Sequence, residues 1–213
     1  MTTPTAMVFV IDDDKSVRKS LRRLLDAANH NTEVFNSASE FLSRLPHPGP
    51  SCIIIDVRMP GLTGIDLQKI IMESGREEQL VFITAHGDIA MCAQAMKAGA
   101  VDFLPKPFKP KQLLESVERA LSRSAEQLRR SSERNDARAL LQQLTPREYE
   151  VMRLVATGLL NKQVGGELGM AEKTVKTHRA HMMQKLQITS VAELMVVLQK
   201  AEVTPPVRPG TKV

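Results

Sequence analysis

The sequence predicts an α/β domain built on a doubly wound, five-stranded parallel sheet, followed by a long helical linker and a small all-α domain of four helices. Over the first half of the chain, short apolar runs alternate with amphipathic helical patterns, which is typical of parallel strands joined by right-handed crossovers. Beyond about residue 110 only helical periodicity remains. Thr145-Pro146 then restarts the chain with a helix cap and a proline suited to a first helical turn.

The predicted strands are short, and most of them are continuous apolar runs. The clearest precedes Pro60-Gly61 and ends on Asp56. A continuous apolar run is typical of an interior strand of a parallel sheet, so we expect Asp56 at the carboxyl end of such a strand. An ordinary turn or helix-capping aspartate is the alternative for that residue taken alone. The other predicted strands are 7–11, 32–36, 80–84 and 100–104.

Helical spacing predicts helices at 17–28, 37–45, 63–72 and 88–97 in the first domain, which we place at residues 5–123. A long helical pattern begins near Pro110 and runs to 144. Polar Ser131, Ser132 and Asn135 interrupt its apolar stripe, so we expect the helix to break or fray there, within a linker of 124–144. A short coiled coil is the alternative, but the stripe does not hold for three heptads.

The second domain, residues 145–203, is predicted to be a small bundle containing a helix-turn-helix. The tail from Thr204 is expected to be disordered, because it is rich in proline. The turn of the motif falls at Gly169, and polar and basic residues occupy the outer sides of the helix that follows it, as suits base edges and phosphates. A solvated face of a plain bundle is the alternative. The predicted helices are 146–157, 162–168, 172–186 and 191–201.

Charge points to the same part of the chain. The net charge is +5, and residues 145–213 contain 10 Lys and Arg but only 6 Asp and Glu, whereas residues 1–123 contain 15 of each. The charge permits nucleic acid as a partner and does not by itself establish one. With no Trp and one Tyr, base stacking on a single-strand platform is disfavoured. No run approaches the ~18 apolar residues of a membrane span, so we expect a cytoplasmic protein without membrane contact.

Five polar side chains fall where predicted parallel strands end, on one edge of the sheet. Carboxylates gathered there would repel one another without a cation, and oxygen ligands favour Mg²⁺ or a similar hard ion such as Mn²⁺. A hydroxyl and a lysine opposite them would bind phosphoryl oxygens. The set predicts a site that makes and breaks an acyl phosphate on an aspartate. Its members are Asp12, Asp13, Asp56, Thr84 and Lys106.

The runs VIDDD, IIIDVRMPG, VFITAHGD and MKAGAVDFLPKPF resemble, in order and spacing, the receiver domains of two-component response regulators, over about residues 5–123. The resemblance implies a CheY-like, flavodoxin-like fold. It also implies that Asp56 is the phosphoacceptor, and that Asp12, Asp13 and Asp56 hold the metal together with the backbone carbonyl of Arg58.

By the same resemblance, Thr84 and Phe103 form the switch pair, with Phe103 standing where many members have Tyr. Lys106 pairs with phosphoryl oxygen, and the Lys106-Pro107 bond is cis. Arg58 and His86 occupy positions that tune phosphoryl lifetime in relatives. The surface around residues 88–110 is the dimer-forming face in relatives.

The run LTPREYEVMRLVATGLLNKQVGGELGMAEKTVKTHRAHMMQKL resembles the four-helix LuxR-type DNA-binding domain. With the receiver in front, the chain is similar to FixJ or NarL class regulators, nearer FixJ. The resemblance places Lys176, Thr177 and Ala180 at bases, and it places at phosphates Lys162, Thr174, His178 and Arg179. Two departures stand out: Ala171 replaces the usual serine cap, and Gly165-Gly166 lies within a helix, so we expect a loose domain without DNA.

These features predict a transcription factor, not an enzyme, that is switched by phosphorylation. The expected partners are a histidine kinase, promoter DNA, a second copy of the chain when phosphorylated, and RNA polymerase. An Mg²⁺-dependent phosphohydrolase is one alternative, but such enzymes need a second acid where this chain has Arg58. A constitutive DNA-binding or scaffolding regulator with a receiver that takes no phosphate is the other.

Overall fold

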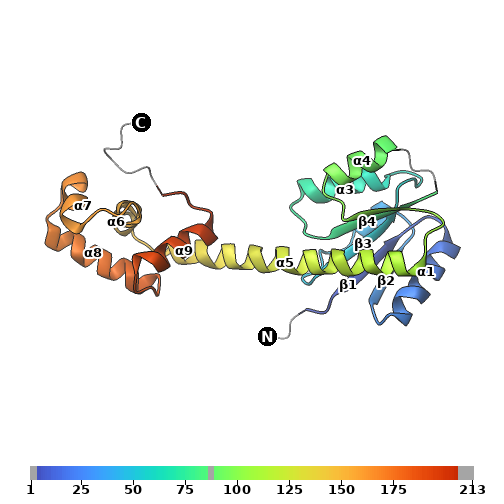
Figure 1. Ribbon diagram of the computed structural model, residues 1–213, viewed down its shortest axis with the longest axis horizontal. Helices are drawn as coiled ribbons and strands as arrows, with labels where there is room; N and C mark the ends of the chain where they lie inside the picture. The colour runs from blue at the N-terminus through green and yellow to red at the C-terminus, as the bar shows by residue number, and fades with distance from the viewer. Residues whose placement is uncertain (1–3, 86–88, 206–213) are drawn as a thin grey trace. The chain divides into compact units, whose positions relative to one another are not determined.

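The computed structural model describes residues 4–85 and 89–205, and the chain divides into two compact units between Leu128 and Arg129. The first unit contains a five-stranded sheet of order β2-β1-β3-β4-β5 in which every neighbouring pair is parallel. The predicted sheet is therefore confirmed (Figure 1). Its strands are β1 (Met7–Ile11), β2 (Asn31–Phe35), β3 (Ser51–Asp56), β4 (Gln79–Thr84) and β5 (Asp102–Pro105).

Helices cover both faces of this sheet, as doubly wound topology requires. The first face packs against α2, α3 and α4 through side chains such as Phe41, Leu67 and Ala95. The second packs against α1 and the start of α5 through residues such as Leu25 and Val117. Figure 1 shows α3 and α4 together on one side of the strands. The helices are α1 (Lys15–Ala27), α2 (Ala38–Leu42), α3 (Gly64–Glu73), α4 (Ile89–Lys97) and α5 (Pro110–Gln142).

Strand β3 is the centre of the first unit because it lies between β1 and β4 and is buried on both faces. Ile53 and Ile55 contribute to the first core, whereas Cys52 and Ile54 contribute to the second. This explains why the sequence shows a continuous apolar run instead of an alternating one. The strand delivers Asp56 to the carboxyl edge of the sheet, where ligands bind in open α/β folds.

Element boundaries shift from the prediction by a few residues. The helix expected at 37–45 ends at Leu42. The strand expected at 100–104 begins at Asp102, because Gly99, at φ 89°, first ends the preceding helix with a left-handed turn. The predicted start of that helix at Asp88 lies outside the described residues, as does His86.

The expected break near 131–135 is wrong, because α5 is helical without interruption through Gln142. Polar residues interrupt its apolar stripe, but other contacts replace the lost packing. Arg129 pairs with Glu133 one turn along the helix, and Glu133 also lies 3.4 Å from Lys200. Ala137 and Leu141 are buried in the core of the second unit. The later part of the predicted linker is therefore packed structure.

In the second unit, the observed ends of the helices lie within one or two residues of the predicted ends. Its core gathers Val151, Val164, Val175, Met182 and Leu198, so one apolar cluster holds all four helices. Residues 206–213, which include most of the tail expected to be disordered, lie outside the described chain. The helices are α6 (Pro146–Ala156), α7 (Asn161–Leu168), α8 (Glu172–Lys185) and α9 (Val191–Ala201).

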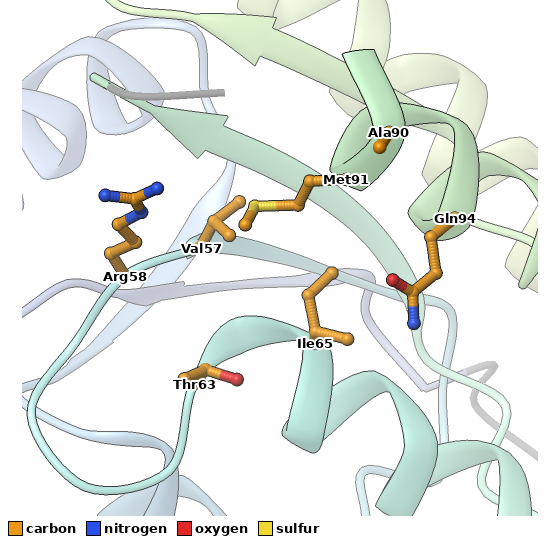
Figure 2. Close-up of a pocket in the computed structure, with 7 residues that line it drawn as sticks. All are labelled: Val57, Arg58, Thr63, Ile65, Ala90, Met91 and Gln94. Atoms are coloured by element: carbon orange, nitrogen blue, oxygen red, sulfur yellow. The ribbon is translucent and has the colours of Figure 1, made fainter. Parts of the chain in front are cut away.

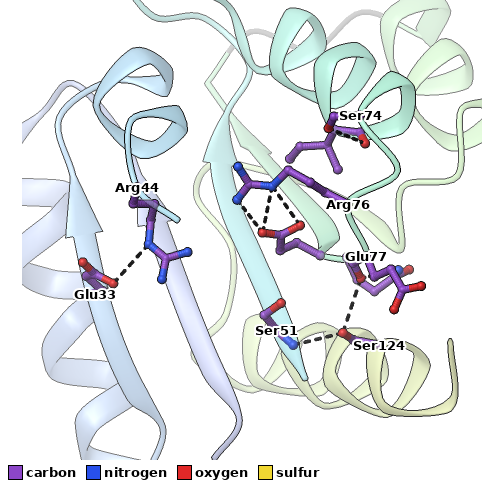
Figure 3. Close-up of polar contacts among 10 residues, drawn as sticks. Glu33, Arg44, Ser51, Ser74, Arg76, Glu77 and Ser124 are labelled. Carbon is purple, nitrogen blue, oxygen red and sulfur yellow. Dashed lines mark hydrogen bonds and ion pairs between the residues drawn. The ribbon is translucent and has the colours of Figure 1, made fainter. Parts of the chain in front are cut away.

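Polar contacts fasten α5 to the amino-terminal side of the sheet (Figure 3). The Ser124 hydroxyl accepts a hydrogen bond from the Ser51 backbone N–H at 3.0 Å and donates to the Glu77 carbonyl at 3.4 Å. Arg76 and Glu78 form a buried ion pair nearby, at 2.5 Å. The two Ser124 hydrogen bonds are directional, so they fix the position of α5 more narrowly than non-directional apolar packing does.

Within residues 4–85 and 89–205, we find no helix that combines the length and the hydropathy needed to cross a membrane.

Candidate functional site

The site forms where β1, β3 and the residue after β5 meet. Lys106 Nζ donates to Asp56 Oδ2 at 2.6 Å and to Asp12 Oδ2 at 2.9 Å. The structure therefore brings together three of the side chains that the sequence places at one edge. The predicted cis peptide between Lys106 and Pro107 is present. Lys106 is further fixed by its backbone N–H, which donates to the Thr84 carbonyl at 2.7 Å.

Burial sharpens the electrostatics of this cluster. Asp12 is 1% exposed and Asp56 is 8% exposed. Desolvation raises the pKa of Asp12 above its ordinary value, against hydrogen bonds from Lys106 and from the Asp14 backbone that act to lower it. Burial acts to lower the pKa of Lys106, but its hydrogen bonds to Asp56 and Asp12 outweigh that effect and raise it. The cluster thus holds carboxylate charge that favours a further cation.

The loop after β1 holds Asp12 in place. The Asp14 N–H donates to Asp12 Oδ1 at 2.8 Å, and Arg18 Nη1 donates to the Asp12 carbonyl at 2.5 Å. Sequence reasoning missed Arg18, since nothing in the helical spacing of α1 marks it. Asp14 caps α1, and Asp13 is exposed. Among the described residues, no group of three or more His, Cys, Asp and Glu side chains is placed to hold a metal.

The loop after β3 holds Asp56 from the other side. The Arg58 backbone N–H donates to Asp56 Oδ1 at 3.0 Å, while the Arg58 side chain is exposed. Gly64, at the start of α3, packs so closely that an added Cβ would lie 2.7 Å from the Asp56 carbonyl oxygen. Any larger residue there would push β3 and α3 apart.

A cavity of about 480 Å³ lies beside this loop, between the end of β3, the start of α3 and α4 (Figure 2). Figure 2 shows Met91 of α4 facing Val57, with Ile65 of α3 below them. The cavity begins at Val57, the residue after Asp56, and reaches α4 through Met91. The remaining lining residues are Arg58, Thr63, Ala90 and Gln94.

The predicted switch residues occupy neighbouring strands. Thr84 ends β4 and is 1% exposed. Phe103 on β5 is partly buried, and its ring centroid lies 6.1 Å from that of Phe82 on β4. Sheet register aligns Thr84 with Pro105, two residues beyond Phe103. The pair is therefore placed on the two strands nearest Lys106.

In the second unit, α7 and α8 form the predicted helix-turn-helix. Arg179, which the resemblance places at a phosphate, donates from Nη1 to Asn161 Oδ1 at 3.0 Å. That bond fixes α8 against the start of α7. His178 and Arg179 are half-buried, and the other predicted contact residues are exposed: Lys162, Thr174, Lys176, Thr177 and Ala180.

The two departures in this motif have different outcomes. Ala171 makes no side-chain cap to α8, as expected. Gly165 is buried, and a Cβ there would lie 2.6 Å from the Met170 carbonyl oxygen, so the turn between α7 and α8 requires glycine at this position. Gly166 is exposed and would accept a side chain in open space. Only Gly166 is therefore a pure cost to the helix.

An ion pair between the buried Glu148 and the half-buried Lys185 holds α6 to α8. Lys185 Nζ donates to Glu148 Oε2 at 2.6 Å, and Glu148 completes the cap of α6 by accepting from the Thr145 N–H at 2.8 Å. Burial acts to raise the pKa of Glu148, but the hydrogen bonds from Lys185 and Thr145 lower it below its ordinary value.

Comparison with known proteins finds a family match for each of the two units. Residues 8–118 match the response regulator receiver domain, and residues 142–198 match the luxR family of bacterial regulatory proteins. The chain is 46% identical over 192 residues to nodulation protein W of Bradyrhizobium diazoefficiens, covering 89% of this chain and 84% of that protein. It is 37% identical over 199 residues to the transcriptional regulatory protein FixJ of the same organism, covering 93% and 97%.

A solved structure extends the likeness to the fold. The response regulator StyR is 46% identical, with a TM-score of 0.81 over 92% of this chain and 99% of that one. The same assignment follows from the two domain matches and from relatives that match nearly the whole chain. This chain belongs to the FixJ-like response regulators, two-component transcription regulators that join a receiver domain to a LuxR-type DNA-binding domain.

Proposed function

We propose that Asp56 accepts a phosphoryl group from a phosphohistidine of a partner kinase. Asp56 is supported as the acceptor by one observation above all: Lys106 Nζ lies 2.6 Å from its Oδ2. An oxygen of Asp56 attacks phosphorus, the phosphorus–nitrogen bond of the donor breaks, and the imidazole leaves with the bonding pair. The product is an acyl phosphate on Asp56, and Lys106 then pairs with a phosphoryl oxygen.

The donor set suits Mg²⁺ because the candidate ligands are oxygens, and because the carboxylates of Asp12 and Asp56 converge, each within hydrogen-bond distance of the same Lys106 Nζ. Asp12, Asp13, Asp56 and the carbonyl of Arg58 would hold it. When bound, the ion neutralises negative charge on the transferring phosphoryl group. The residues around it orient the acceptor: the Arg58 N–H holds one oxygen of Asp56, and Arg18 fixes the loop that carries Asp12.

Phosphorylation changes the receiver by adding roughly −1.5 to −2 charges beside Thr84 and Lys106. The Thr84 hydroxyl turns toward the phosphoryl group and the Phe103 ring moves inward beside it. This shifts the population toward a surface, around residues 88–110, on which two copies of the chain pair. The exposed side chains of Ile89 and Met96 on α4 supply apolar area for such pairing.

Paired chains present two helix-turn-helix motifs to promoter DNA in the cytoplasm. Lys176, Thr177 and Ala180 are exposed on α8 and face bases in the major groove. Lys162, Thr174 and His178 contact phosphates. Arg179 does so while remaining positioned by Asn161. RNA polymerase is the further partner through which bound regulator alters transcription.

The test is incubation of the full-length chain with acetyl phosphate and Mg²⁺, read by intact mass. Wild type gains one phosphate, Asp56→Ala gains none, and Asp26→Asn, on the exposed face of α1, serves as a matched control that behaves as wild type. Equal uptake by wild type and Asp56→Ala would remove Asp56 as the acceptor. No uptake by wild type would favour the regulator that works without phosphate.

A further inference from the structure

Asp102, the residue before the switch position, makes contacts in two directions. Its Oδ1 accepts the backbone N–H of Phe103 at 2.8 Å. Its Oδ2 accepts from Ser116 Oγ at 2.5 Å and from Arg119 Nη2 at 2.6 Å, both on α5. One carboxylate therefore joins the backbone of Phe103 to the helix that continues into the second unit.

The α5 side of this contact is itself organised. Ser116 is fully buried, and its hydroxyl accepts from Arg119 Nη2 at 2.9 Å. Arg119 thus contacts Asp102 directly and also supports the serine that does. Because β5 is the last strand of the sheet, one edge of its backbone has no neighbouring strand. The Phe103 N–H can therefore donate to a side chain, here that of Asp102.

Elsewhere, α5 meets the sheet through apolar packing and through hydrogen bonds to β3 and β4. Its apolar packing runs through Leu113, Val117 and Ala120 and includes Leu104 of β5. Its other polar contacts join Ser124 to Ser51 and Glu77 (Figure 3) and Gln127 to Gln79, at the amino-terminal end of the sheet. Apolar packing is non-directional and tolerates small shifts. A charge-assisted bond with set geometry does not.

We propose that Asp102, Ser116 and Arg119 form a coupling clamp that transmits a change at Phe103 to α5. Asp102 is a positioning residue in this role: it touches neither the phosphoryl group nor DNA. The inference rests on the proposed function, in which Phe103 responds to phosphorylation of Asp56. When β5 shifts, the clamp draws the first turns of α5 with it; when the clamp is cut, phosphorylation proceeds but α5 no longer follows.

The experiment uses the full-length chain with acetyl phosphate and Mg²⁺, and combines intact mass with amide hydrogen exchange over residues 110–123. In wild type, phosphorylation changes exchange in this segment. In Asp102→Asn and Arg119→Gln, phosphate uptake is unchanged while the phosphorylation-dependent change in exchange falls by about fivefold or more. Lys111→Gln, which removes an exposed ion pair with Glu115 on the same helix, is the matched control and responds as wild type.

A second readout needs no phosphate. Asp102→Asn weakens the acceptor for the Phe103 amide, so exchange of that amide accelerates by about threefold or more. In the phosphorylated chain, Arg119→Lys, which keeps the positive charge, restores part of the coupling lost in Arg119→Gln. A full response of α5 in both clamp variants, or an unchanged Phe103 amide in Asp102→Asn, would overturn the proposal. Absence of phosphate uptake by wild type would instead count against the proposed function. In that case, the exchange rate of the Phe103 amide in Asp102→Asn decides whether Asp102 holds the backbone of Phe103.

Discussion

Lys106 Nζ lies 2.6 Å from Asp56 Oδ2, within the distance of a charge-assisted hydrogen bond. We expect Lys106→Met to slow phosphate uptake by about tenfold to hundredfold, because the transferring oxygens lose a preorganised positive charge. Time courses of intact mass with acetyl phosphate measure it. Lys109→Met, at an exposed lysine three residues on, is the matched control. Equal rates for wild type and Lys106→Met would contradict the role given to this lysine.

Asp12 should trade stability for ion binding. Desolvation raises its pKa in the folded chain, so its ionised form is disfavoured by folding. The sign follows: this cost is absent below the unfolded pKa and is fully present once pH exceeds the raised folded pKa. Asp12→Asn should therefore be more stable than wild type at pH 7 and no more stable near pH 4. Thermal unfolding of the first unit without added metal measures the difference.

Bound Mg²⁺ should make wild type more stable than Asp12→Asn at pH 7. At a concentration roughly tenfold above its dissociation constant, Mg²⁺ should stabilise wild type by about 1.4 kcal/mol, because only the folded chain binds it. Asp12→Asn should gain little, having lost a ligand. Chelation should return wild type to its starting unfolding temperature. A Mg²⁺-induced shift of equal size in both proteins would count against Asp12 as a ligand.

Glu148 should set the acid limit of the second unit. Its pKa is lowered in the folded chain, so its contribution is complete above the ordinary glutamate pKa and is lost as pH falls through the lowered value. Glu148→Gln should destabilise this unit by about 2 kcal/mol at pH 7, and by much less near pH 3. Glu150→Gln, which breaks only the exposed pair with Arg147, is the control. Denaturant unfolding followed by amide exchange of α6 and α8 separates the units.

Two adjacent glycines should respond in opposite directions. Gly165→Ala should destabilise the helix-turn-helix by about 2 kcal/mol or more, since its Cβ would meet the Met170 carbonyl at 2.6 Å. Gly166→Ala should stabilise it by about 0.5–1 kcal/mol, because alanine is the better helix former and nothing lies nearby. Thermal unfolding of each variant measures both changes. The same sign for both would show that the turn yields to the added methyl group.

DNA contacts should separate by their salt dependence. Affinity is measured on duplexes that the phosphorylated chain selects from random sequence. Lys162→Gln should reduce the slope of log affinity against log salt concentration by about 1, as expected for one lost phosphate contact. Lys200→Gln, at a lysine paired with Glu133 on α5, should leave the slope unchanged. Lys176→Ala should relax sequence preference as well as weaken binding, because a base contact carries sequence information.

Most of the fold could be predicted from the sequence, because its pattern is local. The apolar run through β3 and the helical spacing of α6 to α9 report which faces are buried, and they placed these elements within a few residues. The edge residues Asp12, Asp56 and Lys106 followed from strand register, since parallel strands end on one side of a sheet.

Where prediction failed, the deciding partner lay far along the chain. The apolar stripe of α5 fails near Ser131, yet the helix continues because Glu133 meets Lys200 and Ala137 enters a core made by other helices. Likewise, the sequence predicts that Gly165 only weakens its helix. The structure shows that a Cβ at this position would meet the Met170 carbonyl oxygen, which is distant information that helical spacing does not contain.

By itself, the sequence determined the order of elements, the edge that carries the acidic residues and the domain that binds DNA. Hydrophobic periodicity and charge are properties of the local sequence, so they can be read without the structure. Only the tertiary structure decided which of these side chains touch. Asp12 and Asp56 share Lys106 while Asp13 stays exposed, Arg179 is held by Asn161, and Asp102 joins Phe103 to α5. Such contacts depend on packing between distant segments, which no local pattern encodes.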